Sequence, residues 1–441
     1  MRPGFKCGGS RLTVIMARIL ITGATGFIGR HLASALHAVG HDVVGTARSA
    51  RPAERGAATR FIEADFTRDH SPGDWLPRLE GIDIVINAVG ILRQDRHRRF
   101  EAIHVNAPRA LFEACAASRV KLVIQFSALG ADEYAQSQYH RSKREADRVL
   151  ARVGVPFVVV QPSLVFGSDG VSAALFTRLA AAPLIPLPGK GDQRVQPIHI
   201  DDVVAAVIEL IEHNRLRNQC IPLVGPAPLS LREFLAQLRH ALGLGKARFL
   251  PVPLALVRLL AKFGAFLPAS LLDDETLGML LRGNSADTAP TRRLLGREPR
   301  AVSEFIGTRE RQTMRRVAKL QGLLPMLRFS IALVWIVSGI VSLGVYPIED
   351  SYALLARAGV TGWAAPFFLY GAALLDIAFG IAVLILPRRR WLWLAQATVI
   401  MLYTAVITWR MPEFWLHPYG PVLKNIPMLA AIWLLLELEE A

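Results

Sequence analysis

The chain has 441 residues, more than one hydrophobic core usually organises, so we expect at least two structural units. The formal net charge is +15, but the basic residues are spread along the chain without interleaved aromatic residues, which argues against a nucleic-acid partner. The three cysteines form no CxxC pair and have no zinc-type spacing with histidine, so we expect reduced thiols and no metal site.

The positive charge is confined to the first part of the chain. There are 45 Lys or Arg against 29 Asp or Glu up to Arg328, and 6 against 7 from Phe329 onward. A basic domain beside an anionic bilayer gains about 1 kcal/mol of binding free energy for each well-placed basic residue.

Residues 1–16 lack an apolar run long enough for a signal peptide, so we expect a disordered extension, with Met16 as an alternative start.

Short apolar strands alternate with helical stretches from Ala17 to about Ile306. The predicted strands are ARILIT, DVVGTA, FIEAD, IDIVINAVG, KLVIQFS and PFVVVQP. Continuous apolar strands of this kind, separated by helices, are typical of a parallel sheet covered on both faces. We therefore predict an α/β fold over residues 17–306, a Rossmann-type doubly wound parallel sheet with a small substrate-binding part.

The first predicted strand and helix are joined by the glycine-rich turn GATGFIG, residues 23–29. Glycines permit a tight turn and close backbone approach, so that amides at a helix N-terminus can bind a pyrophosphate. The strand before it and the helix after it make this context specific, although a structural turn without ligand is the alternative. The residues assigned to the cofactor here are Gly23, Thr25, Gly26, Phe27, Ile28 and Gly29.

Arg48 stands at the end of the second predicted strand, where NAD-selective sites place Asp or Glu. A guanidinium suits the 2′-phosphate of NADP, and Arg30, just after the last glycine, could assist. We therefore expect NADP(H), with NAD as the alternative if Arg48 is only a solvated surface residue.

Tyr139 and Lys143 lie four residues apart on a predicted helix, which places both side chains on one face. A nearby ammonium group favours the phenolate form of a tyrosine whose ordinary pKa is about 10. Such a lowered pKa is what acid/base chemistry near neutral pH requires.

These motifs together resemble the short-chain dehydrogenase/reductase family. TGATGFIGR, SALGAD and PIHIDDV narrow the resemblance to its extended or atypical branch, the group related to the nucleotide-binding accessory subunit of respiratory complex I. The further residues that carry it are Asp65, NAVG at 87–90, Ser127, Tyr139 and Lys143.

The resemblance implies roles for these positions. Tyr139 would exchange a proton with the substrate oxygen, Lys143 would hold the cofactor ribose and lower the pKa of the tyrosine, and Ser127 would hydrogen-bond the reacting oxygen. Asp65 would lie beside the adenine. The loop that would line the cofactor consists of Ala88, Val89 and Gly90. Some relatives in this branch bind nucleotide without known turnover, so a non-catalytic role stays open.

A basic linker, residues 307–328, precedes an abrupt change to apolar sequence. Four candidate membrane spans follow within 329–438, at about 329–345, 363–386, 391–409 and 421–436, each approaching the roughly 20 residues that cross a bilayer. Their length and topology, with VWIVSGIVSLG, resemble the small DoxX-like membrane family. The sequence thus predicts an all-α, four-helix transmembrane domain.

Basic residues flank these spans unevenly. Six precede the first span and Arg388, Arg389 and Arg390 separate the second from the third, whereas the two other loops hold one each. By the positive-inside rule, both ends of the bundle and the nucleotide domain face the cytoplasm, in a multi-pass protein of the inner membrane.

Asp376 lies near the middle of the second predicted span, where an ionised carboxylate is costly. Two interpretations are open: a path for a polar substrate or proton, or a protonated or paired carboxyl that fixes helix packing, with Arg410 or Lys424 as partner.

Two hypotheses of function follow. The first is a membrane-anchored NADP(H)-dependent oxidoreductase acting on a lipophilic carbonyl, alcohol or quinone-type substrate at the lipid bilayer. The second is a non-catalytic nucleotide-binding scaffold or assembly factor for a membrane redox complex.

Overall fold

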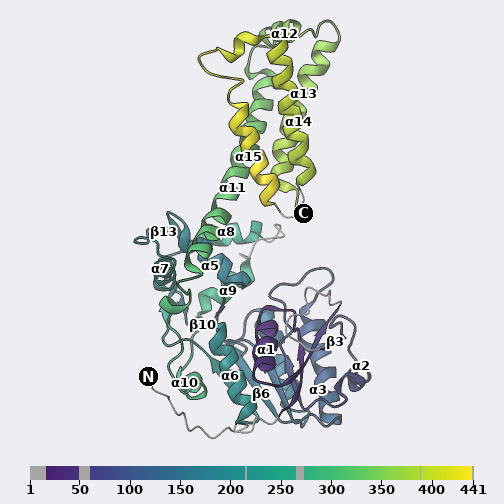
Figure 1. Ribbon diagram of the computed structural model, residues 1–441, viewed down its shortest axis with the longest axis vertical. Coiled ribbons are helices and arrows are strands. Elements are labelled where there is room, and N and C mark those ends of the chain that lie inside the picture. The colour runs from purple at the N-terminus through teal and green to yellow at the C-terminus, as the bar shows by residue number, and fades with distance from the viewer. Residues whose placement is uncertain (1–15, 49–59, 214–215, 265–272, 388, 440–441) are drawn as a thin grey trace, which may run out of the picture. The chain divides into compact units, whose positions relative to one another are not determined.

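The computed structural model describes residues 16–48, 60–213, 216–264, 273–387 and 389–439 (Figure 1). The chain divides into two compact units, residues 1–316 and 317–441. The division falls within the basic segment 307–328, most of which is helical. Apart from Met16, the expected amino-terminal extension lies outside the described residues.

A seven-stranded sheet organises the first unit. All its neighbouring strands are parallel, and their order is β3-β2-β1-β4-β5-β6-β11. This confirms the predicted doubly wound fold, in which the strand order reverses between β1 and β4. The strands are β1 (Arg18–Thr22), β2 (Asp42–Ala47), β3 (Arg60–Glu63), β4 (Ile84–Asn87), β5 (Leu122–Phe126), β6 (Phe157–Pro162) and β11 (Gln219–Leu223).

Helices cover both faces of this sheet, because the strands are apolar on both sides. Along β1, Ile19 and Ile21 belong to one apolar cluster, whereas Leu20 between them belongs to the other. This is the period of two expected of a strand. The first cluster includes α1 (Phe27–Ala38), α6 (Ile200–Glu212) and α10 (Ala289–Leu295), and the second includes α2 (Pro72–Trp75), α3 (Ala107–Ala117) and α4 (Gln138–Leu150).

Further helices and two-stranded sheets complete the first unit. The helices are η2 (Leu76–Leu79), η3 (Glu101–Asn106), α5 (Val171–Ala181), α7 (Leu231–Ala241), α8 (Leu254–Gly264), α9 (Asp274–Arg282) and η4 (Val302–Glu304). The short strands pair as β7 (Val165–Phe166) with β10 (Ile198–His199), β9 (Arg194–Val195) with β12 (Leu229–Ser230), and β8 (Ile185–Pro188) with β13 (Phe249–Val252).

A buried carboxylate joins the PIHIDDV segment to a later part of the chain. Asp202, in the PIHIDDV segment, is fully buried at the start of α6. The Arg297 guanidinium donates to its Oδ1 at 2.5 Å, and the backbone N–H of Arg300 donates to its Oδ2 at 2.8 Å. Residues 297–300 are therefore held to the start of α6 through charge-assisted hydrogen bonds.

The second unit is helical. Its elements are α11 (Arg311–Ile340), which begins in the basic segment, η5 (Val341–Val345), α12 (Ile348–Arg357), α13 (Ala364–Ile385), α14 (Arg390–Arg410), η6 (Pro412–Trp415) and α15 (Asn425–Leu438). Three helical stretches within the described residues, 311–345, α13 and α14, are long and apolar enough to cross a membrane.

The fourth expected span differs from its prediction in length. Residues 421–424 form a turn, and α15 begins only at Asn425 and has 14 residues. At 1.5 Å per residue it is about 21 Å long, shorter than a hydrocarbon layer of about 30 Å. Hydropathy alone could not separate the turn from the helix, because Pro421, Val422 and Leu423 continue the apolar run.

Glycines bring α11 and α13 into close contact. A Cβ on Gly339 would lie 2.5 Å from the carbonyl oxygen of Ala373, and one on Gly380 would lie 2.7 Å from that of Ala332. Small residues at such positions let membrane helices approach closely.

We expect Gly380→Val to destabilise the helical unit, because the new side chain would collide with Ala332 and Ile336 on α11. Overpacking of this kind typically costs about 1–3 kcal/mol. The thermal unfolding midpoint of the detergent-solubilised protein should fall by several degrees. Gly371→Ala is the matched control, since no atom lies within 4 Å of its added Cβ. Equal midpoints for both variants would argue against this contact.

Candidate active site

Polar side chains line the carboxyl ends of three adjacent strands. The Thr22 hydroxyl at the end of β1 donates to Asn87 Oδ1 at 2.6 Å, and Asn87 Nδ2 donates to Gln125 Oε1 of β5 at 2.7 Å. All three residues are buried. They fix the edge of the sheet where its strand order reverses, the place where doubly wound folds bind their ligands.

The glycine-rich turn lies at this edge. Gly23 has φ +70°, and a Cβ there would lie 3.1 Å from the carbonyl oxygen of Ala88 in the loop after β4. A Cβ on Gly29 would lie 2.1 Å from the carbonyl oxygen of Gly23. Both positions therefore require glycine.

The turn leads directly into α1. Thr25 lies in the turn, Gly26 is the N-cap, and Phe27, Ile28 and Gly29 form the first turn of the helix. Because Gly26 offers no side chain to cap the helix, its first amides remain suited to a phosphate group.

Two of the three charged residues expected at the cofactor occupy the neighbouring strand ends. Arg48 is exposed after β2, and Asp65 follows β3. Burial raises the pKa of Asp65, but hydrogen bonds from Thr67 and the nearby Arg48 and Arg68 guanidinium groups outweigh it and hold that pKa below its ordinary value. Arg48 and Asp65 are therefore electrostatic neighbours.

Arg30 has a different partner. Its guanidinium donates to the Asp169 carboxylate at 2.5 and 2.9 Å. It therefore links α1 to the segment after β7, and the expectation that Arg30 assists Arg48 receives no support from its position.

The expected catalytic residues gather beside the loop after β4. Ser127 follows β5, while Tyr139 and Lys143 lie on α4. Lys143 Nζ donates to the carbonyl oxygens of Val89 at 3.2 Å and of Phe126 at 3.0 Å, and a Cβ on Gly90 would lie 3.1 Å from it. The structure thus brings the loop 88–90, Ser127 and Lys143 together.

The pKa of Tyr139 corrects one expectation. Burial and the Asp147 carboxylate raise it to about 12, whereas the sequence predicted that Lys143 would lower it. Burial also lowers the pKa of Lys143 to about 8 against the opposing effect of Asp147. The carboxylate, which sequence reasoning overlooked, thus works against the effect expected of the ammonium group.

Asp147 contacts Ser127, one of the three expected catalytic residues. Ser127 Oγ donates to Asp147 Oδ2 at 2.5 Å, and burial raises the pKa of Asp147 to about 6 although Ser127 and Lys143 oppose this. Tyr139, Lys143 and Asp147 follow one another at intervals of four residues on α4. The helical spacing that identified the first two could therefore have identified the third.

His104 is a second residue that sequence reasoning missed. It is buried in η3, where its Nε2 accepts from the N–H of Ile91 at 3.0 Å. Its Nδ1 lies 2.8 Å from Ser142 Oγ, which donates to the Tyr139 carbonyl oxygen. These contacts fit a neutral imidazole protonated on Nδ1, and burial and Lys143 lower the pKa of His104 to about 2. His104 therefore ties the loop after β4 to the start of α4.

Helix α9 contacts the same region from the later part of the unit. Glu275 accepts from the Tyr139 N–H at 2.8 Å, and Asp273 forms an ion pair with Arg93 at 2.6 Å. Arg282 at the other end of α9 is paired with Asp132 at 2.5 Å. Three polar contacts thus hold α9 over the start of α4.

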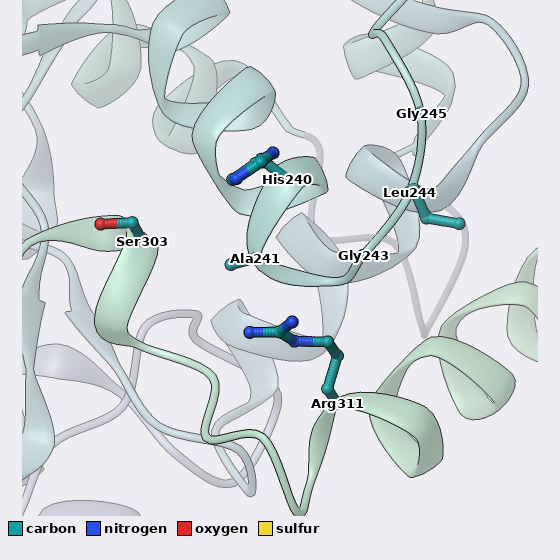
Figure 2. A pocket seen from close by; sticks show the side chains of 7 residues that line it. All are labelled: His240, Ala241, Gly243, Leu244, Gly245, Ser303 and Arg311. Carbon is teal, nitrogen blue, oxygen red and sulfur yellow. The ribbon is translucent and has the colours of Figure 1, made fainter.

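A separate hollow lies elsewhere in this unit. Figure 2 shows its lining residues, which come from the end of α7, the following turn, η4 and the first residue of α11. None of the predicted site residues lines it.

The comparisons with known proteins agree with this geometry. Residues 19–221 match the NAD dependent epimerase/dehydratase family, and residues 332–433 match the DoxX-like family. The first unit is therefore similar to the epimerase/dehydratase family and the second to the DoxX-like family, which confirms both family resemblances.

Two curated relatives match parts of the chain. The chain is 28% identical over 194 residues to the ceramide reductase of Caulobacter vibrioides, an alignment that covers 43% of this chain and 59% of that protein. It is 26% identical over 263 residues to mitochondrial NADH dehydrogenase [ubiquinone] 1 alpha subcomplex subunit 9 of Mus musculus, covering 58% of this chain and 67% of the relative.

Solved structures share the fold. A nucleoside-diphosphate-sugar epimerase from Staphylococcus aureus superimposes with a TM-score of 0.52 at 20% identity, over 65% of this chain and 99% of that one. The UDP-glucuronic acid 4-epimerase of Bacillus cereus, solved with UDP-glucuronic acid and NAD, gives 0.50 at 18% identity over 69% and 99%.

We expect Asp147→Asn to change how stability depends on pH. Because the pKa of Asp147 is raised from 3.8 to about 6 on folding, its contribution is complete below about pH 4 and is lost as the pH rises toward 6. Two pKa units correspond to about 3 kcal/mol. The Asp147→Asn variant should not show this loss of stability with rising pH.

Thermal unfolding midpoints of the solubilised protein, measured from about pH 4 to about pH 7, test this expectation. Glu145→Gln is the matched control, since it removes a half-buried carboxylate from the same helix. A wild-type pH profile in Asp147→Asn would show that Asp147 carries no such linkage.

Proposed function

We propose that the protein is a membrane-anchored NADP(H)-dependent oxidoreductase acting on a lipophilic carbonyl, alcohol or quinone-type substrate. The observation that carries the proposal is the convergence of Ser127, Lys143 and the loop 88–90 beside the glycine-rich turn, in a chain that also has a DoxX-like unit. A nucleotide domain fixed at a bilayer meets membrane-dissolved substrate without extracting it into water.

In a carbonyl reduction, Tyr139, Ser127 and Lys143 would each have a separate role. Tyr139, with a pKa of about 12, is protonated at neutral pH, and we assign it the role of proton donor to the substrate oxygen. Ser127 hydrogen-bonds that oxygen, and Lys143 holds the cofactor ribose. The bound nicotinamide supplies the hydride, while the protein supplies orientation and the proton.

Cofactor choice depends on Arg48 in this proposal. The family is NAD-dependent by description, and an NAD-selective site usually presents a carboxylate to the ribose at this strand end. This chain presents an exposed guanidinium there, which would pair with the 2′-phosphate of NADP. The site residues retained in the proposal are those expected from the sequence, Gly23 to Gly29, Arg48, Asp65, Ala88 to Gly90, Ser127, Tyr139 and Lys143.

The substrate class is supported by two independent observations. One relative is named as a ceramide reductase, which is a reductase of a lipid, and three helical stretches of this chain are long and apolar enough to cross a membrane. The uneven distribution of arginines supports a multi-pass protein of the inner membrane with its nucleotide domain in the cytoplasm.

A second candidate function is a nucleotide-binding scaffold or assembly factor of a membrane redox complex. It is favoured by the similarity to a subunit of NADH dehydrogenase. Purified protein that retains nucleotide and partner subunits, but oxidises no NADPH in the presence of membrane lipid extract, would support this function instead.

We expect Tyr139→Phe to abolish turnover and to leave cofactor binding unchanged, because it removes only the proton donor. Consumption of NADPH with long-chain ketones and quinones in detergent measures the first effect, and calorimetric titration with NADPH measures the second. Loss of a general acid should lower kcat by about 10²- to 10⁴-fold. Full activity in the variant would refute the catalytic role.

We expect Arg48→Ala to weaken binding of NADPH about tenfold while NADH binding stays the same, because a charge-assisted bond to phosphate is lost. Calorimetric titration with each coenzyme separates the two effects. Arg152→Ala, at another exposed arginine, serves as control. Equal losses of affinity for both coenzymes would show that Arg48 does not bind the 2′-phosphate of NADPH.

A further inference from the structure

The helical unit contains buried polar side chains that the proposed reaction does not use. Asp376 on α13 is 7% exposed and Gln396 on α14 is fully buried. Their neighbours in sequence, Phe379, Trp393 and Ile400, belong to the apolar cluster of this unit. In hydrocarbon, water does not satisfy buried polar atoms, so partners must come from within the site.

Each of the two side chains has one hydrogen-bonded atom and one without a partner. The Trp335 indole N–H donates to Gln396 Oε1 at 2.9 Å, and the Ser338 hydroxyl donates to Asp376 Oδ2 at 3.2 Å. Within the described part of the chain, Asp376 Oδ1 and Gln396 Nε2 have no hydrogen-bond partner. Leaving such atoms unmatched is unfavourable, so both point to a bound group.

The two unmatched atoms belong to one small region. Trp335 and Ser338 are three residues apart on α11, so they lie on the same face about 4.5 Å apart along the helix axis. Asp376 and Gln396 approach that face from α13 and α14, which run beside α11 in this unit (Figure 1). The two hydrogen bonds thus place Asp376 and Gln396 beside the same turn of α11.

We propose that α11, α13 and α14 form an intramembrane site for the hydroxyl group of an uncharged, membrane-dissolved alcohol. A hydroxyl group both donates and accepts, so it can donate to Asp376 Oδ1 and accept from Gln396 Nε2. An ether oxygen can only accept, so it would match Gln396 Nε2 and leave an ionised Asp376 carboxylate unmatched. The inference depends on the helical unit alone and goes beyond the proposed reductase activity.

Tyr403 marks the side of the proposed site that would face lipid. It lies two turns after Gln396 on α14, interacts electrostatically with Asp376, and is 39% exposed. Exposed side chains nearby on α13 and α14, such as Leu374 and Met401, are apolar. The alkyl chain of a bound alcohol would therefore remain in hydrocarbon while its hydroxyl group reaches the buried pair.

The test uses the full-length protein in lipid nanodiscs and a long-chain primary alcohol that carries a photoreactive diazirine and an alkyne. After irradiation, mass spectrometry locates the labelled peptides. We expect saturable labelling of α11, α13 or α14, competed by the unlabelled alcohol and not by its methyl ether. Gln396→Leu and Asp376→Asn should each lower this labelling about five- to tenfold, as expected for one lost hydrogen bond.

Thr398→Val is the matched control, because Thr398 is an exposed polar residue on α14. It should label like the wild type, and the unfolding midpoint of each variant shows whether the bundle is folded. Equal competition by alcohol and ether, or wild-type labelling in a folded Gln396→Leu variant, would overturn the proposal. Those results would assign the two unmatched atoms to bound water. NADPH turnover is measured in a separate assay. A lack of turnover would count against the proposed reductase activity but would not change the interpretation of the labelling.

Discussion

Close backbone approach between the turn after β1 and the loop after β4 is the constraint on which the candidate site depends. Gly23 contacts Ala88, and Gly29 in turn fits against the carbonyl of Gly23, so no side chain can separate these segments. The two loops belong to the strands between which the sheet order reverses. That contact brings the first amides of α1 beside the loop that also contacts Lys143.

The electrostatics of the site follow from burial as much as from the expected catalytic residues. Lys143 and Asp147 are both buried on one face of α4, and each shifts the proton affinity of its neighbours. A lysine alone would favour the tyrosinate, but the carboxylate and the loss of solvent favour the neutral phenol. At neutral pH the phenol therefore holds the proton that reduction of a carbonyl consumes, but its raised pKa makes it a weaker acid than a free tyrosine.

Sequence reasoning recovered what depends on periodicity and on backbone sterics. Apolar strands gave the sheet, the glycines gave the turn, and the apolar runs gave the membrane helices. What it missed depends on contacts between distant segments: the pairing of Arg30 with Asp169, the effect of Asp147 on Tyr139, and the link from His104 through Ser142. The length of α15 was overestimated because a turn and a helix share the same hydropathy.

The anchoring of Asp202 bears on how this architecture can change. Arg297, which binds that carboxylate on α6, lies 95 residues further along the chain. Within this interval the chain leaves the sheet after β11 and returns at α10, where the N–H of Val224 donates to Thr291 Oγ1 at 3.0 Å. An interval whose ends lie close together can be replaced without moving the scaffold on either side. The part between these two residues includes α7, α8 and α9, and α9 contacts Tyr139. New substrate preferences could thus arise by exchanging this part alone, while the seven-stranded sheet stays intact.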